Sequence, residues 1–212
     1  MNLLSSIKKG NKYLLLVFIL LFVAVWANSL IGTTDMANWI IENTLTVISL
    51  IFLISTYRAF RFNNFSYLLL CIFLCMHVYG SKCTYAENPL GFYFQEIFTS
   101  PRNQYDRLVH FSFGLLLFYP MWECFSKWLK YPKSIALSLP ILVVVSVGAI
   151  YEIIEWLVAD VFFAEQGISY LGTQGDIWDA QKDMAVAFAG VCIATLLFYL
   201  YNLSKRKSLT HH

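Results

Sequence analysis

Long stretches without a charged residue constrain the fold of this chain more than any other feature. Residues 134–151 carry no charge, and neither do residues 185–204. A helix needs about 20 mainly apolar residues to cross the hydrocarbon core of a bilayer. The composition agrees, because 58% of the residues are hydrophobic, only 13% are charged, and the mean hydropathy is +0.61. The chain is therefore predicted to cross a membrane several times.

We predict an all-α bundle of six transmembrane helices. The spans are expected at about residues 13–34, 37–57, 65–80, 106–124, 134–159 and 182–203. They form a single transmembrane domain over residues 1–207, and residues 208–212 are interpreted as a tail or tag remnant. The aromatic run FYFQEIF lies between turn residues after the third span, so a short interfacial helix is expected there. Before the last span, Gly167, Gly172 and Gly175 suit tight turns.

Charged residues are unevenly distributed between the two sides of this topology. Eleven Lys and Arg residues lie at the N-terminus, in the second and fourth connections, or in the tail, and only four lie elsewhere. Short cytoplasmic connections of membrane proteins carry an excess of Lys and Arg. Both termini are therefore predicted to be cytoplasmic. Twelve of the thirteen acidic residues lie toward the other side, and Glu123 is the exception.

The acidic residues are concentrated in one segment, Tyr151 to Met184, which holds seven of the thirteen. A carboxylate at the centre of a membrane helix costs roughly 2.5–3.5 kcal/mol on the insertion scale. These carboxylates should therefore lie at a membrane boundary or face a polar cavity that opens outward. On the predicted topology, four helices bring ionisable residues to one depth: His77, Asp106, Arg107, His110, Glu152, Glu155, Asp176, Asp179 and Asp183.

Helical spacing also groups these ionisable residues on shared helix faces. Asp106 and His110 are four residues apart, so they share a helix face. Glu152 and Glu155 are three apart and share another. If the sixth helix began before Asp176, then Asp176, Asp179 and Asp183 would form one stripe that continues to the small residues from Ala187 to Gly190. Small residues allow helices to approach closely, and Gly114 could do the same on the fourth span.

Crowded carboxylates in a low-dielectric site cannot all stay ionised without cations or protons. A divalent metal ion of undetermined identity would satisfy them, because carboxylates and imidazoles are common ligands. The predicted ligands are Glu152, Asp179, Asp183 and His110. The catalytic candidates are Glu155, His77, Arg107 and Asp106. Among these, Arg107 suits an anionic headgroup, a histidine can shuttle protons, and a carboxyl with a raised pKa can act as acid or base.

A purely structural interpretation of the same cluster stays open. Carboxylates and arginines at helix ends can pair to fix loops, and Asp176 or Asp179 can cap the sixth helix. Lys82 and Arg102 could fold over the cluster and add positive charge. Glu42 on the second span could join it or lie at the membrane interface.

Four sequence segments resemble the YjdF-like family of bacterial inner-membrane proteins. They are HVYG at 77–80, DRLVHFSFG at 106–114, YEIIEW at 151–156 and LGTQGDIWDAQKDM at 171–184. The resemblance covers nearly the whole chain, and the family is distantly similar to VanZ-like proteins. It implies a small helical protein of the bacterial inner membrane, but it implies no reaction and no catalytic residue.

The leading hypothesis is a metal-dependent enzyme that acts on a lipid or lipid-linked envelope substrate at the outer leaflet. A proton- or cation-coupled transporter and a non-catalytic binding or structural protein are the alternatives. No HExxH, GxSxG, P-loop or dinucleotide motif occurs. The expected partners are membrane lipids and the lipid substrate, with no nucleic acid, and the sequence leaves protein partners undetermined.

Overall fold

The computed structural model describes residues 11–162 and 173–210, which contain helices and no strand. Six of the helices are long and apolar enough to cross a membrane, as predicted. They are α1 (Lys12–Leu30), α2 (Met36–Thr56), α3 (Asn64–Lys82), α5 (Tyr105–Glu123), α6 (Lys133–Leu157) and α8 (Asp179–Thr210). Two π-helical turns, η3 (Cys124–Trp128) and η4 (Val158–Phe162), extend α5 and α6.

Some helix ends differ from the predicted ones. The first span was predicted to reach residue 34, but α1 ends at Leu30, because the chain turns at Gly32 with φ +77° and Asp35 then caps α2. The last helix begins at Asp179, three residues before the predicted start, and continues through Thr210 into the predicted tail. Gly175 has φ +84°, which fits the predicted turn, whereas Gly167 and Gly172 lie outside the described residues.

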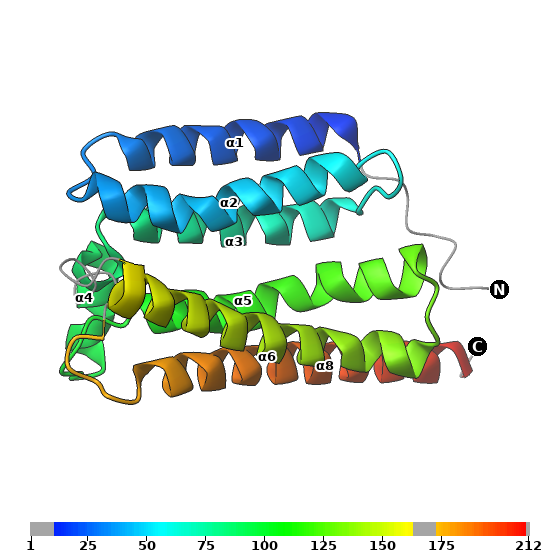
Figure 1. The fold of residues 1–212 in the computed structure, drawn as a ribbon. Helices are drawn as coiled ribbons and strands as arrows, with labels where there is room; N and C mark the ends of the chain where they lie inside the picture. The colour runs from blue at the N-terminus through cyan, green and yellow to red at the C-terminus, as the bar shows by residue number, and fades with distance from the viewer. Residues whose placement is uncertain (1–10, 163–172, 211–212) are drawn as a thin grey trace.

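The predicted interfacial helix corresponds to α4 (Pro89–Ile97), which follows a short 3-10 turn, η2 (Tyr85–Glu87). Asn88 caps α4 by accepting a hydrogen bond from the Leu90 amide at 3.0 Å. Figure 1 shows α4 at the end of the bundle opposite to the start of α1 and the end of α8. The described ends of the chain therefore share one end of the bundle, as six crossings require.

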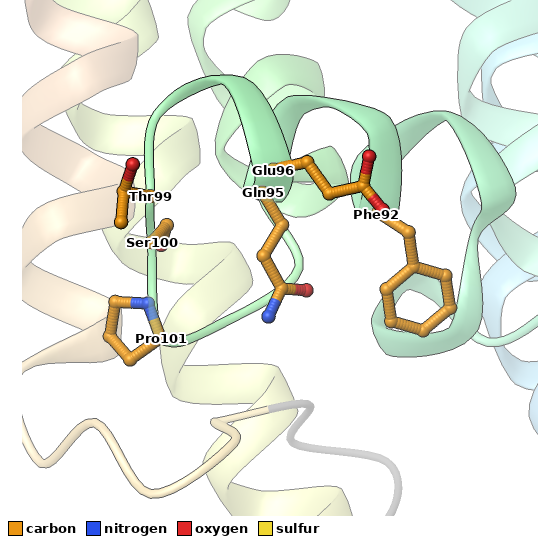
Figure 2. A pocket seen from close by; sticks show the side chains of 6 residues that line it. All are labelled: Phe92, Gln95, Glu96, Thr99, Ser100 and Pro101. Atoms are coloured by element: carbon orange, nitrogen blue, oxygen red, sulfur yellow. The ribbon is translucent and has the colours of Figure 1, made fainter.

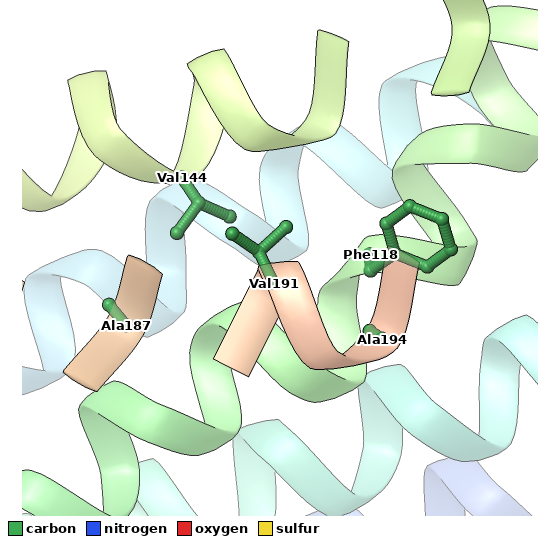
Figure 3. Close-up of a cluster of buried hydrophobic side chains, with 5 residues drawn as sticks. All are labelled: Phe118, Val144, Ala187, Val191 and Ala194. Atoms are coloured by element: carbon green, nitrogen blue, oxygen red, sulfur yellow. The ribbon is translucent and has the colours of Figure 1, made fainter. Parts of the chain in front are cut away.

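Small residues hold α5 and α8 together, as predicted. A Cβ atom on Gly114 would lie 2.0 Å from the Ala187 carbonyl oxygen, and one on Gly190 would lie 2.3 Å from the Phe111 carbonyl oxygen. The two backbones are therefore in direct contact. α6 covers this pair, and the core between the three helices contains Phe118, Val144, Ala187, Val191 and Ala194 (Figure 3).

The first three helices form a second group that is joined to the first through α3 and α5. Phe73 on α3 packs against Tyr105 and Val109 on α5. At the end of the bundle where the chain starts, the buried Glu123 carboxylate accepts hydrogen bonds from the Asn63 amide and the Ser66 hydroxyl and pairs with Lys127 at 2.8 Å. Glu123 therefore has a structural role, because its hydrogen bonds connect the start of α3 to the end of α5.

Candidate functional site

Three carboxylates converge where α5 and α8 begin. One carboxylate oxygen from each of Asp106, Asp179 and Asp183 lies within 4.8 Å of the other two. Oxygen ligands bind Mg²⁺ or Ca²⁺ at about 2.0–2.6 Å, so two ligands of one ion lie no more than about 5 Å apart. The carboxylates therefore have the spacing of a metal site. Asp106, predicted as a catalytic residue, lies among the predicted ligands.

His110 and Glu152 extend this group toward α6. The His110 Nε2 atom lies 3.6 Å from Asp106 Oδ1 and 3.7 Å from Glu152 Oε1. Both distances exceed a normal hydrogen bond but suit donor atoms around a common ion. The side chains of His110 and Glu152 are only 11% and 10% exposed. The structure thus brings the four predicted ligands to one place, on three helices.

Arg107 lies on the other side of the same aspartates. Its Nη2 atom is 2.6 Å from Asp176 Oδ2 and 3.5 Å from Asp179 Oδ1, and its Nε atom is 3.9 Å from Asp183 Oδ1. Lys182 also pairs with Asp176, at 2.7 Å. This hydrogen-bonded ammonium lowers the pKa of Asp176 below its ordinary value, so Asp176 is a firmly ionised partner for the cations.

Asp176 does not belong to the helical stripe that the sequence suggested. Because α8 begins only at Asp179, Asp176 lies in the preceding turn, where its side chain accepts a hydrogen bond from the Trp178 amide at 3.1 Å. It reaches the cluster through Arg107, not through the face of α8.

Arg102 is a buried site residue that the sequence interpretation left outside its candidates. It is 3% exposed, its Nη1 atom hydrogen-bonds Asp179, and its Nη2 atom lies 3.8 Å from Asp106 Oδ2. Burial lowers the pKa of Arg102, and the Asp106 carboxylate acts in the opposite direction. The sequence indicated only that Arg102 could fold over the cluster, and the structure shows that it does so from the loop before α5. Lys82 instead donates to Asn28 at 3.1 Å.

Buried amides fix the loop that carries Arg102. Asn103 is 1% exposed, and its side chain accepts from the Tyr105 amide at 3.0 Å and donates to the Asn88 carbonyl at 2.8 Å. Its backbone amide donates to the Gln174 side chain at 2.8 Å. These bonds connect the start of α4, the start of α5 and the segment before α8, and so hold Arg102 over the cluster.

The carboxylates line a hollow of about 400 Å³, called the carboxylate hollow below. Its wall includes Asp106, Glu152, Glu155, Asp179 and Asp183, so the predicted catalytic residue Glu155 faces the same space as the predicted ligands. A larger hollow of about 720 Å³ lies along α4 and the segment after it. Figure 2 shows its six lining side chains, among which Glu96 is the one ionisable group. The ionisable side chains are therefore concentrated in the carboxylate hollow.

Within residues 11–162 and 173–210, two buried carboxylate oxygens in the cluster accept no hydrogen bond, namely Asp183 Oδ1 and Glu152 Oε1. Leaving a buried polar group unsatisfied costs roughly 1–3 kcal/mol, and more for a charged group. The described charges do not balance either, because six carboxylates face the three cations Arg102, Arg107 and Lys182. A bound cation or protons on some carboxyls would satisfy both conditions.

His77 lies beside this cluster rather than within it. Its Nε2 atom is 3.1 Å from the Glu42 carbonyl oxygen, and its Nδ1 atom is 2.6 Å from the Tyr85 hydroxyl. Glu42 is 4% exposed, and its Oε2 atom accepts a hydrogen bond from the Tyr151 hydroxyl at 3.1 Å. Glu42 therefore reaches the neighbourhood of the cluster through Tyr151, next to Glu152.

Removing the Arg102 charge should leave Asp179 without its buried partner. Breaking one side of a buried ion pair typically costs about 3–5 kcal/mol, so Arg102→Gln should lower the thermal midpoint of the purified protein by several degrees. Lys82→Gln is the matched control, because its exposed bond to Asn28 should matter little. Equal midpoints for the two variants would contradict the role given to Arg102.

Comparison with known proteins shows which family the chain belongs to. Residues 14–204 match the family model described as predicted membrane protein (DUF2238). The chain belongs to this family. It is also 33% identical over 170 residues to the inner membrane protein YjdF of Escherichia coli (strain K12), which covers 79% of this chain and 80% of that protein.

No solved structure matches the chain. The match to YjdF confirms the resemblance to YjdF-like proteins that the four segments indicated. Together with the six apolar helices, membership of the DUF2238 family identifies a multi-pass inner-membrane protein.

Proposed function

We propose that the protein is a metal-dependent enzyme that acts on a lipid or lipid-linked envelope substrate at the outer leaflet of the membrane. Asp183 carries this proposal: its side chain is 2% exposed, it lies within ligand distance of Asp106 and Asp179, and one of its oxygens has no hydrogen-bond donor in the described part of the chain. A buried carboxylate in this state calls for a cation.

The donor set restricts the metal. Three carboxylates alone would suit Mg²⁺ or Ca²⁺, whereas an imidazole from His110 shifts the preference toward Mn²⁺, Fe²⁺ or Zn²⁺. A divalent ion would supply Lewis acidity and lower the pKa of a bound water. Glu155, which lines the same hollow, is then the candidate general base.

The arginines support an anionic substrate. In the structure, Arg102 and Arg107 neutralise the aspartates that would become metal ligands. A cation bound by those aspartates would free part of the guanidinium hydrogen-bonding capacity for a phosphate or carboxylate of the substrate, which arginine recognises in a bidentate manner. Metal and anionic headgroup would therefore be bound together.

The binding test uses purified wild-type protein and Mn²⁺. Equilibrium dialysis should show a stoichiometric site, and Mn²⁺ should raise the thermal midpoint, because a ligand at 100 times its Kd stabilises by about 2.7 kcal/mol. A chelator should reverse that increase. Protein that holds no divalent metal and whose midpoint ignores both additions would refute the metal proposal.

The outer-leaflet location rests on the Lys and Arg distribution, so we also predict the topology. Reporter fusions after Phe62 and Tyr131 should report the cytoplasm, because they follow the Lys- and Arg-rich side. Fusions after Glu87, and after Gly167 outside the described residues, should report the opposite side. A cytoplasmic signal at either of these last two positions would overturn the predicted topology and, with it, the outer-leaflet location of the cluster.

Glu42 favours a second candidate function, a proton-coupled carrier. Its carboxyl group is buried on a membrane-spanning helix and hydrogen-bonded to Tyr151. Buried ionisable groups at membrane depth are typical of proton relays. The two functions differ in their need for metal: a carrier of this kind should move protons into vesicles without any divalent ion, whereas the enzyme should be inactive without one.

A further inference from the structure

A second, smaller hollow of about 50 Å³ adjoins the cluster, one to two helical turns deeper in the spans. Asp106 lines both this smaller hollow and the carboxylate hollow, and His110 lies on the wall of the smaller hollow. Its wall also contains the polar side chains of His77, Tyr85 and Tyr151. The remaining six lining residues are apolar or glycine: Leu45 on α2, Phe73 on α3, Val109 and Phe113 on α5, and Val147 and Gly148 on α6. The carboxylate hollow and this more apolar hollow thus meet at Asp106.

The wall of the smaller hollow includes Leu45 on α2 and Val147 on α6. Val147 is 40% exposed, and Ile48 on α2 and Ile150 on α6 are 57% and 56% exposed. In a membrane these side chains contact lipid tails. α2 packs against α3, while α6 packs against α5 and α8. The Tyr151–Glu42 hydrogen bond joins α2 and α6 at this level.

We infer that the smaller hollow holds the apolar chain of a membrane lipid whose headgroup occupies the carboxylate hollow, with the chain leaving the bundle between α2 and α6. This inference rests on the proposed function for the headgroup chemistry. The volume equals that of one or two water molecules, at about 30 Å³ each in the liquid. Such a space fits the narrow first part of a hydrocarbon chain and excludes a ring or a second headgroup.

The physical chemistry also explains why the two hollows differ. Moving a lipid chain from the bilayer into an apolar pocket brings no hydrophobic gain, because the tails are already in an apolar medium. Affinity must then come from the headgroup at the aspartates and arginines. The smaller hollow has only to let the chain pass from the polar site to the bilayer. The polar side chains His77, Tyr85 and Tyr151 on its wall are hydrogen-bonded within the protein, so the chain does not leave them unsatisfied.

Gly148 offers a direct test. A Cβ atom there has Met184 Cγ as its nearest neighbour at 4.0 Å, so the backbone accepts a side chain and Gly148→Leu should fill the hollow. Gly148→Ala is the packing control. Leu45→Phe fills the same space from α2, so the test does not depend on one variant that folds poorly.

The experiment uses vesicles of phosphatidylethanolamine and phosphatidylglycerol that contain a trace of phosphatidylglycerol with a diazirine in its acyl chain. After irradiation, peptide mapping should find label on Phe73 and Val109, which are only 8% and 5% exposed and which surrounding lipid does not reach. Gly148→Leu and Leu45→Phe should each reduce this label several-fold. Gly148→Ala should retain it, and exposed residues of α1 should be labelled equally in every variant.

Two results would overturn the inference: no label on Phe73 and Val109 in the wild type, or label there that both filling variants leave unchanged. Mn²⁺ dialysis of the same samples separates this outcome from that of the proposed function. Inner-wall label without Mn²⁺ binding would retain the lipid-chain site and reject the metal. Mn²⁺ binding without label on Phe73 and Val109 would retain the metal site and reject the lipid-chain site.

Discussion

Asp183→Asn should abolish high-affinity Mn²⁺ binding while the protein stays folded. Loss of a partner that only orients a ligand typically weakens metal binding by about 10–100-fold, so loss of a ligand charge should weaken it by more than about 100-fold. The amide preserves the volume of the carboxylate. It also removes one negative charge from a cluster in which six carboxylates face three described cations, so the thermal midpoint without metal should not fall.

The other predicted ligands should behave as one unit with Asp183. Asp179→Asn, Glu152→Gln and His110→Gln should each reduce bound Mn²⁺, although the residues lie on three helices. A double variant such as Asp183→Asn with Glu152→Gln should lose little more than either single variant, because residues that act together are non-additive. Additive losses, or full Mn²⁺ binding in Asp183→Asn, would show that these carboxylates do not share an ion.

Gly190→Leu should prevent normal assembly of the bundle. A side chain there would meet the Phe111 carbonyl oxygen at 2.3 Å and the Leu115 amide nitrogen at 2.9 Å, and neither backbone atom can move without separating α5 from α8. We expect a loss of at least about 4 kcal/mol, the range of the most damaging single substitutions. The measurement is the yield of monodisperse protein after extraction, together with its thermal midpoint.

Gly148→Ala is the matched glycine control for this prediction, since its new methyl group would meet only Met184 at 4.0 Å. A normal yield for Gly190→Leu would mean that α8 does not contact α5 through this face. The adjacent aspartates at the start of α8 would then also need a different placement.

The six spans were predictable because apolar length is a local property of the chain. The runs around Val144 and Val191 are long enough to span a bilayer, and the small residues Gly114 and Gly190 indicated where two helices touch. The end of α1 was not predictable from apolarity alone, because the turn at Gly32 and the cap at Asp35 stop a helix that hydropathy would continue.

The sequence predicted which residues of the candidate site lie at the same level of the bundle, but it did not predict which of them are in contact. Spacing on single helices grouped Asp106 with His110, and the topology placed both beside Glu152. Arg102 reaches the aspartates from a loop whose path depends on Asn103 and Gln174, which no helical period describes. His77 shares the depth of the cluster, yet its ring is bonded to Tyr85 and the Glu42 carbonyl oxygen.

The direct contact of the α5 and α8 backbones has a consequence for biosynthesis. Asp106, Arg107 and Gly114 are translated more than 60 residues before Asp179, Asp183 and Gly190. Until α8 has entered the membrane, the face of α5 that carries Gly114 has no helix packed against it. At that stage Arg107 also lacks its aspartate partners on and before α8. Insertion of α8 supplies the packing and the countercharge in a single step, so a nascent chain cannot form the carboxylate cluster before its helical core closes.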